Sequence, residues 1–402
     1  MYSEARVWNK VHEGWRIGKK NMHGILRKLI SIIKRVANYS MVRLRHFLLN
    51  LLIWRSKLTK LATFEESTAF ASEHERTRVW FRRRAIRVLS ELDGIDFHRI
   101  RNGTTNLPLY NPSIIKVAGS GFLLVATESN RVMSYRWGRR PRFVRGSAFT
   151  SNLLLGSPSL DLLPPGESII SLKPLTGMQD VAADARLFNQ DKNLLVVWNQ
   201  GLQVESGRAL TRLWIKSLES STKIIESRVL SSPFDLLIEK NWMPLAHNEG
   251  SSIQFIHTVS PTVTLTIPLD DESSTEVRSN PGPADLTSDR GGSQLIELEN
   301  GHYLAVTHST YLFPARYYSQ RLILFEKIET GFQVVSYSRP FVFKNNFDVE
   351  FASGIALVGG HVLISFGVRD LEAWICKMRA DTALRLASEV PYKSDIVRAK
   401  NG

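Results

Sequence analysis

The stretch EKNWMPLAH, residues 239–247, places a carboxyl group, an ammonium group and an amide side by side, directly after the apolar run FDLLI. At an exposed rim, Glu239 and Lys240 would form an ion pair that contributes about 0–1 kcal/mol. At the end of a buried strand, the same side chains and Asn241 would face the interior, where they could serve a pocket. The function of the stretch therefore depends on the fold that carries it.

Similar polar clusters occur at other strand-like ends of the chain. They are YNPSI (110–114), ADARLF (183–188), RGGS (290–293) with THS (307–309), and VEFASG (349–354) with GVRD (367–370). Asp184 and Arg186, two residues apart, point the same way from a strand, where they either pair structurally or serve a site. Asn111, before Pro112, is either a turn former or a ligand.

The elements that must position these clusters are short strands. From about residue 96 the chain consists of short apolar runs separated by turn residues. A turn leading into an apolar run recurs near residues 121, 193, 251, 301 and 360, at intervals that average about 60 residues. Five all-β units, each long enough for four strands, predict a five-bladed β-propeller over residues 96–390, followed by a polar tail at 391–402. A β-sandwich does not explain the fivefold recurrence.

In a propeller the innermost strands converge on a central funnel, so the clusters at their ends would share one pocket. One segment fits no blade. Residues 269–292 are polar and rich in Pro, Ser and Asp, which predicts a mobile loop over one face. His247 and His257 are expected to be packing or surface residues. Trp242 is expected to line the funnel or the core, or to stack against a ligand.

The ordered series NPSI, DARLF, EKNWMP, GGS, HS, YYSQR, EFASG and GVRDLEAW resembles the five-bladed propeller enzymes that act on glycosides. It is most similar to the β-mannoside phosphorylases and their mannosyltransferase relatives, over roughly residues 105–378. The resemblance implies an all-β enzyme that makes or breaks glycosidic bonds in an oligosaccharide or glycan. It implies no metal and no cofactor, with inorganic phosphate or a sugar-phosphate donor as co-substrate.

The resemblance also implies roles for residues. Asp184 of ADAR matches the aspartic acid that donates a proton to the leaving oxygen, while Arg186 and Lys240 match the cations that hold phosphate. His308 and either Tyr317 or Tyr318 match residues that assist. The further expected ligands are Asn111, Asn130, Asn241, Arg290, Glu350 and Asp370.

Two positions depart from the family pattern. Ala183 stands where a glutamate precedes the aspartic acid, and Thr127 stands where an arginine is frequent in the first inner strand. Asn130 is kept, and Arg131 or Arg136 can substitute for the missing cation. These departures motivate a rival hypothesis, a non-catalytic propeller that binds a glycan or a protein.

Cleavage of a glycosidic bond needs a proton for the departing oxygen, which one carboxylic acid can supply. A phosphate nucleophile needs no second carboxylate, but it needs cations that hold it against the sugar. A water nucleophile needs a carboxylate base. Glu239, Glu350 and Asp370 are candidates for that base, so glycoside hydrolysis remains an alternative.

The basic charge of the chain is confined to its N-terminal part. Residues 1–60 hold 14 Lys and Arg against two acidic residues, whereas the formal net charge of the whole chain is +14. Helical spacing of apolar residues over 25–36 and 41–61, with cations between them, predicts either an interfacial helix pair at an anionic membrane or a helical hairpin packed on its own domain. A third helix is expected over 78–92, which completes a basic helical extension at 1–95.

Nucleic acid is an unlikely partner of this extension, since no DNA- or RNA-binding motif accompanies the basic runs. The N-terminus lacks a signal-peptide core, and the apolar run 47–54 is far shorter than the roughly 20 residues needed to span a bilayer. A single cysteine, Cys376, permits no internal disulfide. Together these features predict a cytoplasmic protein that is peripheral to a membrane.

Overall fold

The chain divides into two compact units, Met1–Ala85 and Ile86–Gly402. The computed structural model describes residues 86–116, 121–129, 133–134, 142–143, 151–156, 166–175, 183–191, 193–203, 209–217, 227–234, 236, 238–270, 275–311, 317–344 and 349–392. The predicted helices and membrane contact within residues 1–85 lie outside these ranges. So do Asn130, Arg131, Arg136 and the tail from residue 393.

The described part of the second unit is mostly β, with five sheets of four or more strands and one two-stranded sheet, none of which closes on itself. The two-stranded sheet pairs β5 (Met133–Ser134) with β6 (Arg142–Phe143). Each larger sheet is named after one of its strands. The β3 sheet contains β3 (Leu109–Lys116), β4 (Phe122–Ser129), β7 (Ser151–Gly156) and β9 (Lys173–Pro174).

The next two sheets follow in chain order. The β10 sheet contains β10 (Ala183–Gln190), β11 (Asn193–Gln203), β12 (Ala209–Ser217), β13 (Arg228–Val229) and β15 (His247–Asn248). The β14 sheet contains β14 (Met243–Pro244), β16 (Ser252–Thr258), β17 (Thr262–Pro268) and β18 (Glu276–Asn280).

The last two sheets also take in strands from the start of the unit. The β21 sheet contains β1 (Arg87–Val88), β19 (Asp289–Gly291), β20 (Ile296–Glu297), β21 (His302–Tyr311), β22 (Tyr317–Ile328), β23 (Gly331–Tyr337), β24 (Phe341–Val342) and β28 (Val390–Pro391). The β25 sheet contains β25 (Glu350–Val358), β26 (His361–Val368), β27 (Glu372–Arg379), β2 (Ile95–Asn102) and β8 (Gly166–Ile170). Because β2 pairs antiparallel with β27, the two ends of the unit meet in one sheet.

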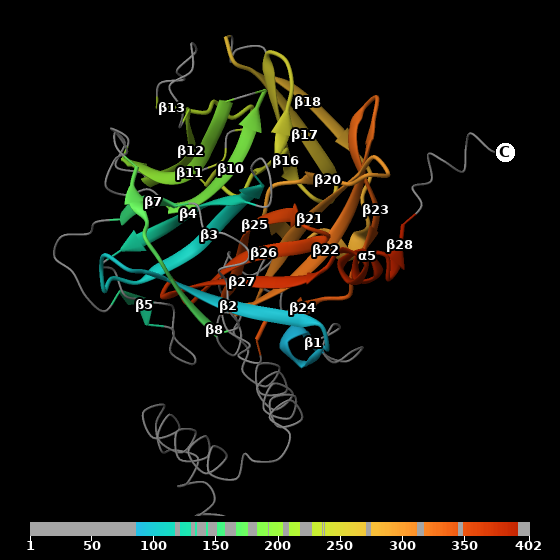
Figure 1. The fold of residues 1–402 in the computed structure, drawn as a ribbon. Helices are drawn as coiled ribbons and strands as arrows, with labels where there is room; N and C mark the ends of the chain where they lie inside the picture. The colour runs from blue at the N-terminus through green and yellow to red at the C-terminus, as the bar shows by residue number, and fades with distance from the viewer. Residues whose placement is uncertain are drawn as a thin grey trace, which may run out of the picture. The chain divides into compact units, whose positions relative to one another are not determined.

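Five hydrophobic clusters join the sheets in a cyclic order, each between two consecutive sheets. Four of them link the β3 sheet to the β10 sheet, the β10 sheet to the β14 sheet, the β14 sheet to the β21 sheet, and the β21 sheet to the β25 sheet. The fifth, which contains Ile114 and Leu363, links the β25 sheet back to the β3 sheet. In Figure 1 the teal strands β3 and β4 accordingly lie between the green β10 sheet and the red strands β25–β27.

The strand-like runs recognised in the sequence are strands, but three predictions about other segments need correction. Residues 269–292, predicted as a loop, contain β18, the 3₁₀ helix η4 (Ala284–Leu286) and β19. β18 is a strand despite its polar sequence because it pairs along β17 and because the buried Asn280 amide donates to the carbonyl oxygen of Phe332.

The predicted helix over 78–92 is not α-helical in its described part, where β1 is followed by the 3₁₀ helix η1 (Leu89–Glu91), whose Leu89 is fully buried. The short helix α5 (Ala380–Ala387), which packs into the core through Ala383 and Leu386, was not expected inside the β domain. In the described ranges, no helix has the length and apolar character needed to cross a membrane.

Candidate active site

Three consecutive sheets each carry a polar residue with left-handed backbone geometry near the start of their first strand. These residues are Asn111 (φ 46°), Asp184 (φ 53°) and Asn241 (φ 63°). The register of β3 shifts between Tyr110 and Ser113, and that of β10 between Ala183 and Arg186, so the first two residues lie in bulges. Asn and Asp tolerate this conformation better than other residues with a Cβ, and a bulge turns a side chain away from the regular pleat.

The Asp184 carboxyl group is half-buried and is held at both of its oxygens by amide side chains. Asn111 Nδ2 donates to Oδ1 at 2.6 Å, and Asn199 Nδ2 donates to Oδ2 at 3.2 Å. Asn111 Nδ2 also donates, at 3.5 Å, to Oδ1 of the half-buried Asp370. Since the two Oδ1 atoms share one donor nitrogen, they are at most about 6 Å apart. The site thus contains two neighbouring carboxyl groups.

Arg186 lies beneath this carboxyl group and is fully buried. Its Nε donates to the carbonyl oxygen of Gly292 at 2.6 Å, Nη1 to that of Asp184 at 2.8 Å, and Nη2 to Asn241 Oδ1 at 3.3 Å. Burial lowers the pKa of Arg186 to about 10, against the opposing effect of the Asp184 charge. Arg186 is therefore charged at neutral pH, yet it has no exposed surface with which to contact phosphate, the role that the resemblance implies for it.

Two glycines allow the backbones around these residues to approach closely. A Cβ on Gly291 would overlap the carbonyl oxygen of Asn241, and a Cβ on Gly367 would overlap Oδ1 of Asn111. Any other residue at either position would push the polar group away. The site consequently depends on glycine in β19 and β26.

Glu239 lies in the interior, but it faces protein donors instead of a pocket. It is 2% exposed; Oε1 accepts from Ser232 Oγ at 2.5 Å, and Oε2 accepts from Trp242 Nε1 at 3.0 Å. His257 Nε2 also lies 3.0 Å from Oε2. Burial raises the pKa of Glu239, but the hydrogen bonds from His257, Ser232 and Trp242 outweigh burial and leave it below the ordinary value.

Glu239 and Trp242 therefore form a clamp that holds the segment carrying the two side chains between them. Trp242 is a core residue, as one of the alternatives for it stated, and His257 packs 4.6 Å from the Phe234 ring. Between the clamped Glu239 and Trp242, Lys240 is half-buried and Asn241 is held by Arg186. The exposed His247 contacts Asn189 and lies outside this group.

Strands β21, β22 and β25 add an aromatic group next to Arg186. The buried His308 ring lies 4.9 Å from the Tyr318 ring and 5.1 Å from the Phe351 ring. The Phe351 ring lies 5.6 Å from the Arg186 guanidinium, which links this group to the Asp184 side of the site. Tyr317 points to the opposite face of β22, where it stacks on Tyr311, because successive side chains of a strand alternate. Of the two candidate tyrosines, Tyr318 is the one beside His308.

Glu350 and Arg290 are placed differently from one another. The Glu350 carboxylate is fully buried and accepts the backbone N–H groups of Phe343 and Lys344, at 2.6 and 2.9 Å. Arg290 is exposed and lies opposite His308 in the pairing of β19 with β21. Glu350 is thus engaged in holding the β24 segment, whereas Arg290 remains accessible.

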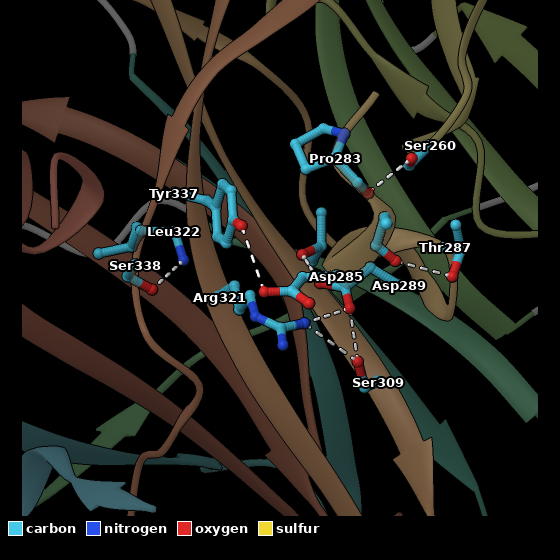
Figure 2. Close-up of polar contacts among 12 residues, drawn as sticks. Ser260, Pro283, Asp285, Thr287, Asp289, Ser309, Arg321, Leu322, Tyr337 and Ser338 are labelled. Atoms are coloured by element: carbon cyan, nitrogen blue, oxygen red, sulfur yellow. Dashed lines mark hydrogen bonds and ion pairs between the residues drawn. The ribbon is translucent and has the colours of Figure 1, made fainter. Parts of the chain in front are cut away.

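A buried ion pair anchors β19 just before Arg290 (Figure 2). Asp289 pairs with Arg321 and accepts hydrogen bonds from Thr307 Oγ1 at 2.8 Å and from Ser309 Oγ at 2.5 Å. Burial lowers the pKa of Arg321, but the Asp289 carboxylate, with smaller contributions from its neighbours, raises it above the ordinary value. This pair fixes the strand whose continuation, Gly292, accepts the Arg186 hydrogen bond.

Sequence reasoning missed Asn199, Phe351 and the two glycines. Asn199 lies opposite Ala183 across the hairpin of β10 and β11, so counting register back from the turn at Asp191 is the signal that locates it. The described residues contain no group of three or more His, Cys, Asp and Glu side chains that could hold a metal ion.

No model of a protein family matches the chain, and no curated protein matches it. Similar solved structures include a β-1,2-mannobiose phosphorylase from Listeria innocua in complex with β-1,2-mannobiose, with 14% identity, a TM-score of 0.48, and 74% of this chain and 94% of that chain covered. A mannose phosphorylase from Leishmania mexicana in complex with a phosphate ion has 10% identity and a TM-score of 0.45, with 80% of this chain and 98% of that chain covered. A GDP-Man-dependent mannosyltransferase from Leishmania mexicana has 13% identity and a TM-score of 0.47, with 79% of this chain and 97% of that chain covered. These structures are of the group that the sequence motifs resemble.

Proposed function

We propose that the five large sheets are the blades of a β-propeller and that the Asp184 site lies at its centre. The cyclic order of the five clusters supports this, because each sheet packs on the one before and the one after it. The pairing of β2 with β27 would then close the ring by joining both ends of the unit in one blade.

We propose that the site acts on glycosidic bonds, with Asp184 as the proton donor to the leaving oxygen. The observation that carries the proposal is the placement of one half-buried carboxyl group on β10, oriented at both oxygens by amides, one from β3 and one from β11. A fixed and partly accessible carboxyl group is what proton transfer to a departing oxygen requires. The expected substrates are mannosides in an oligosaccharide or glycan.

For the second reactant, the proposal is inorganic phosphate or a sugar-phosphate donor. Arg186 is enclosed; accessible cations among the described residues next to the site include Lys240, beside Asn241, Arg290, beside Gly291, and Arg369, beside Asp370. A positioned ammonium group contributes about 1.5–3 kcal/mol to an anion contact. No metal or cofactor enters the proposal.

Hydrolysis is a second candidate, and the position of Asp370 is the observation that favours it. Of the three candidates named from the sequence, Asp370 is the one whose carboxyl group shares a donor, Asn111 Nδ2, with Asp184. The upper bound of about 6 Å between their Oδ1 atoms lies below the roughly 6.5–9.5 Å of inverting glycosidases, so Asp370 would act as the nucleophile of a retaining hydrolase and not as a base that activates water.

The deciding experiment is incubation of the full chain with a panel of mannosyl and other glycosyl donors, with and without phosphate, followed by product analysis. A sugar phosphate formed only with phosphate supports phosphorolysis, while free sugar formed at the same rate without phosphate supports hydrolysis. Sugar binding with no turnover in any condition would make the chain a binding module, the rival that Ala183 and Thr127 suggest.

We further propose that residues 1–60 bind anionic membranes at a cytoplasmic surface, from their concentrated positive charge and amphipathic spacing. Flotation with vesicles of phosphatidylserine and phosphatidylcholine should recover the chain, and recovery should fall with added salt. Equal recovery with purely zwitterionic vesicles would contradict an electrostatic contact.

A further inference from the structure

We propose that Asn199 is a positioning residue that holds the Asp184 carboxyl group in both of its protonation states by turning its side-chain amide. The inference rests on the proposed function, in which Asp184 carries and then releases a proton. It assigns the two neighbouring amides different tasks, with Asn111 fixed and Asn199 able to turn.

Asn199 makes one contact with its amide, and it does so from an enclosed position. The residue is 5% exposed, its Nδ2 donates to Asp184 Oδ2 at 3.2 Å, and its Oδ1 is buried with no hydrogen-bond partner among the described residues. A rotation of 180° would therefore break one hydrogen bond and bring the oxygen to face the carboxyl group. An amide offers both donors and an acceptor, so either orientation can be used.

Asn111 cannot turn in the same way. Its Nδ2 donates to two carboxylate oxygens at once, Oδ1 of Asp184 and Oδ1 of Asp370. A rotated Asn111 would aim its own oxygen at both. Its Oδ1 is also packed against Gly367, where even a Cβ would not fit. Oδ1 of Asp184 thus remains an acceptor throughout, and the proton of the acid form belongs on Oδ2, the oxygen that faces Asn199.

The proton balance follows from this geometry. In the acid form, the O–H of Asp184 donates to Asn199 Oδ1. When substrate is bound, the leaving oxygen replaces Asn199 Oδ1 as the acceptor. As the glycosidic C–O bond breaks, the proton moves from Asp184 to that oxygen. Asn199 then turns its N–H back toward the carboxylate. Among the described residues, the charged groups linked to Asp184 by hydrogen bonds are Asp370, through Asn111, and Arg186, which donates to the carbonyl oxygen of Asp184.

The first test uses stability alone, so it does not depend on turnover. Asn199→Asp places a second carboxyl group beside Asp184 without changing the shape of the side chain, and two carboxylates at this distance cannot both ionise easily. The pair then keeps a proton in the folded state at a pH where the unfolded chain has lost it, so its contribution to stability is lost as pH rises. The urea midpoint of Asn199→Asp should therefore fall further below that of the wild type at pH 8 than at pH 5.

Two variants control this result. The exchange Asp184→Asn with Asn199→Asp restores one amide facing one carboxyl group, so it should return the pH dependence of the midpoint to that of the wild type. Asn106→Asp, the same change at an exposed residue, should have no such effect. If Asn199→Asp follows the wild type at both pH values, or if the exchange does not restore it, the proposed contact is wrong.

The second test uses the pH profile of kcat/KM on a substrate that the wild type turns over. Loss of activity at high pH should shift upward by about one pH unit or more in Asn199→Asp, because the proton now belongs to a pair of carboxyl groups. The exchange variant should be inactive, since its carboxyl group lies on the wrong strand. An active Asn199→Asp with an unchanged profile overturns the positioning role. Absence of turnover by the wild type would instead reject the proposed function, while the stability test still decides the contact.

Discussion

Asn111 donates its side-chain N–H to Asp184 Oδ1 at 2.6 Å and thereby joins the first strands of two sheets whose contacting residues are 73 positions apart in the chain. Both residues have left-handed backbone geometry in bulges, which turns them toward each other. The candidate site thus exists only when the β3 and β10 sheets are packed together through their shared cluster. Changes that separate these sheets should affect the site and the fold together.

Gly367→Ala should damage the site by overpacking. The new methyl group would overlap Asn111 and displace it from Asp184. We expect a loss of about 1–3 kcal/mol in the free energy of unfolding, measured with urea, and a larger proportional loss of turnover. Gly359→Asn is the matched control in the same pair of strands, because nothing lies near its Cβ position and Asn tolerates its positive φ. A fully active Gly367→Ala variant would show that Asn111 does not need its observed position.

Arg186→Met should destabilise the domain more than most single changes. It leaves the carbonyl oxygens of Gly292 and Asp184 and the side-chain oxygen of Asn241 without their donor inside the protein. We expect a loss of about 2–5 kcal/mol in the free energy of unfolding. Arg186→Lys keeps the charge but cannot reproduce three directed hydrogen bonds, so it should recover only part of this loss. Complete recovery by lysine would mean that charge alone matters at this position.

Glu239→Gln tests the clamp through the pH dependence of stability. The pKa of Glu239 lies below 4.5 in the folded chain, so its carboxylate contributes stability above that pH and loses the contribution as pH falls through the folded value. At pH 7 we expect Glu239→Gln to lower the free energy of unfolding by about 1–3 kcal/mol, because Trp242 and His257 lose a charged acceptor.

This difference should shrink when urea unfolding is repeated below pH 4.5, because the carboxylate takes up its proton first in the unfolded chain and only at lower pH in the folded chain. Glu249→Gln, at an exposed position, should differ little from the wild type at any of these pH values. A constant difference between Glu239→Gln and the wild type across the range would assign the effect to shape and not to charge.

Lys240→Ala should raise the phosphate concentration needed for half-maximal turnover roughly ten- to a hundredfold, because it removes a charge-assisted contact of about 1.5–3 kcal/mol. Glycan affinity, measured by isothermal titration without phosphate, should change little. Arg290→Ala is the comparison, since Arg290 is another accessible cation beside the site. If only Arg290→Ala changes the phosphate requirement, the anion lies over β19 and not beside Asn241.

The strands, and the hydrogen bonding of Asn111 to Asp184 between two of the polar clusters at strand ends, agree with what local sequence signals indicate, because apolar runs bounded by turns mark strands and their ends. The orientation of individual side chains could not be predicted from the sequence. The sequence indicates that Glu239 faces a pocket, because its contact with His257 is non-local and cannot be inferred from neighbouring residues. The sequence likewise indicates that Arg186 is a ligand, because its hydrogen bonds to Gly292 and Asn241 join it to distant parts of the chain. The polar composition of β18 indicates a loop. It is a strand because it pairs along β17, a contact that its own composition does not reveal.

The most direct test of the account compares Asp184→Asn with the wild type on two substrates, a mannobiose and a 4-nitrophenyl mannoside. The sugar leaving group needs a proton, whereas 4-nitrophenolate departs readily without one. If Asp184 is the proton donor, Asp184→Asn should lower kcat on the mannobiose by a factor of about 10²–10⁴ and lower it far less on the aryl mannoside. Equal losses on both substrates, or full activity on the mannobiose, would contradict the assignment of Asp184 as the proton donor.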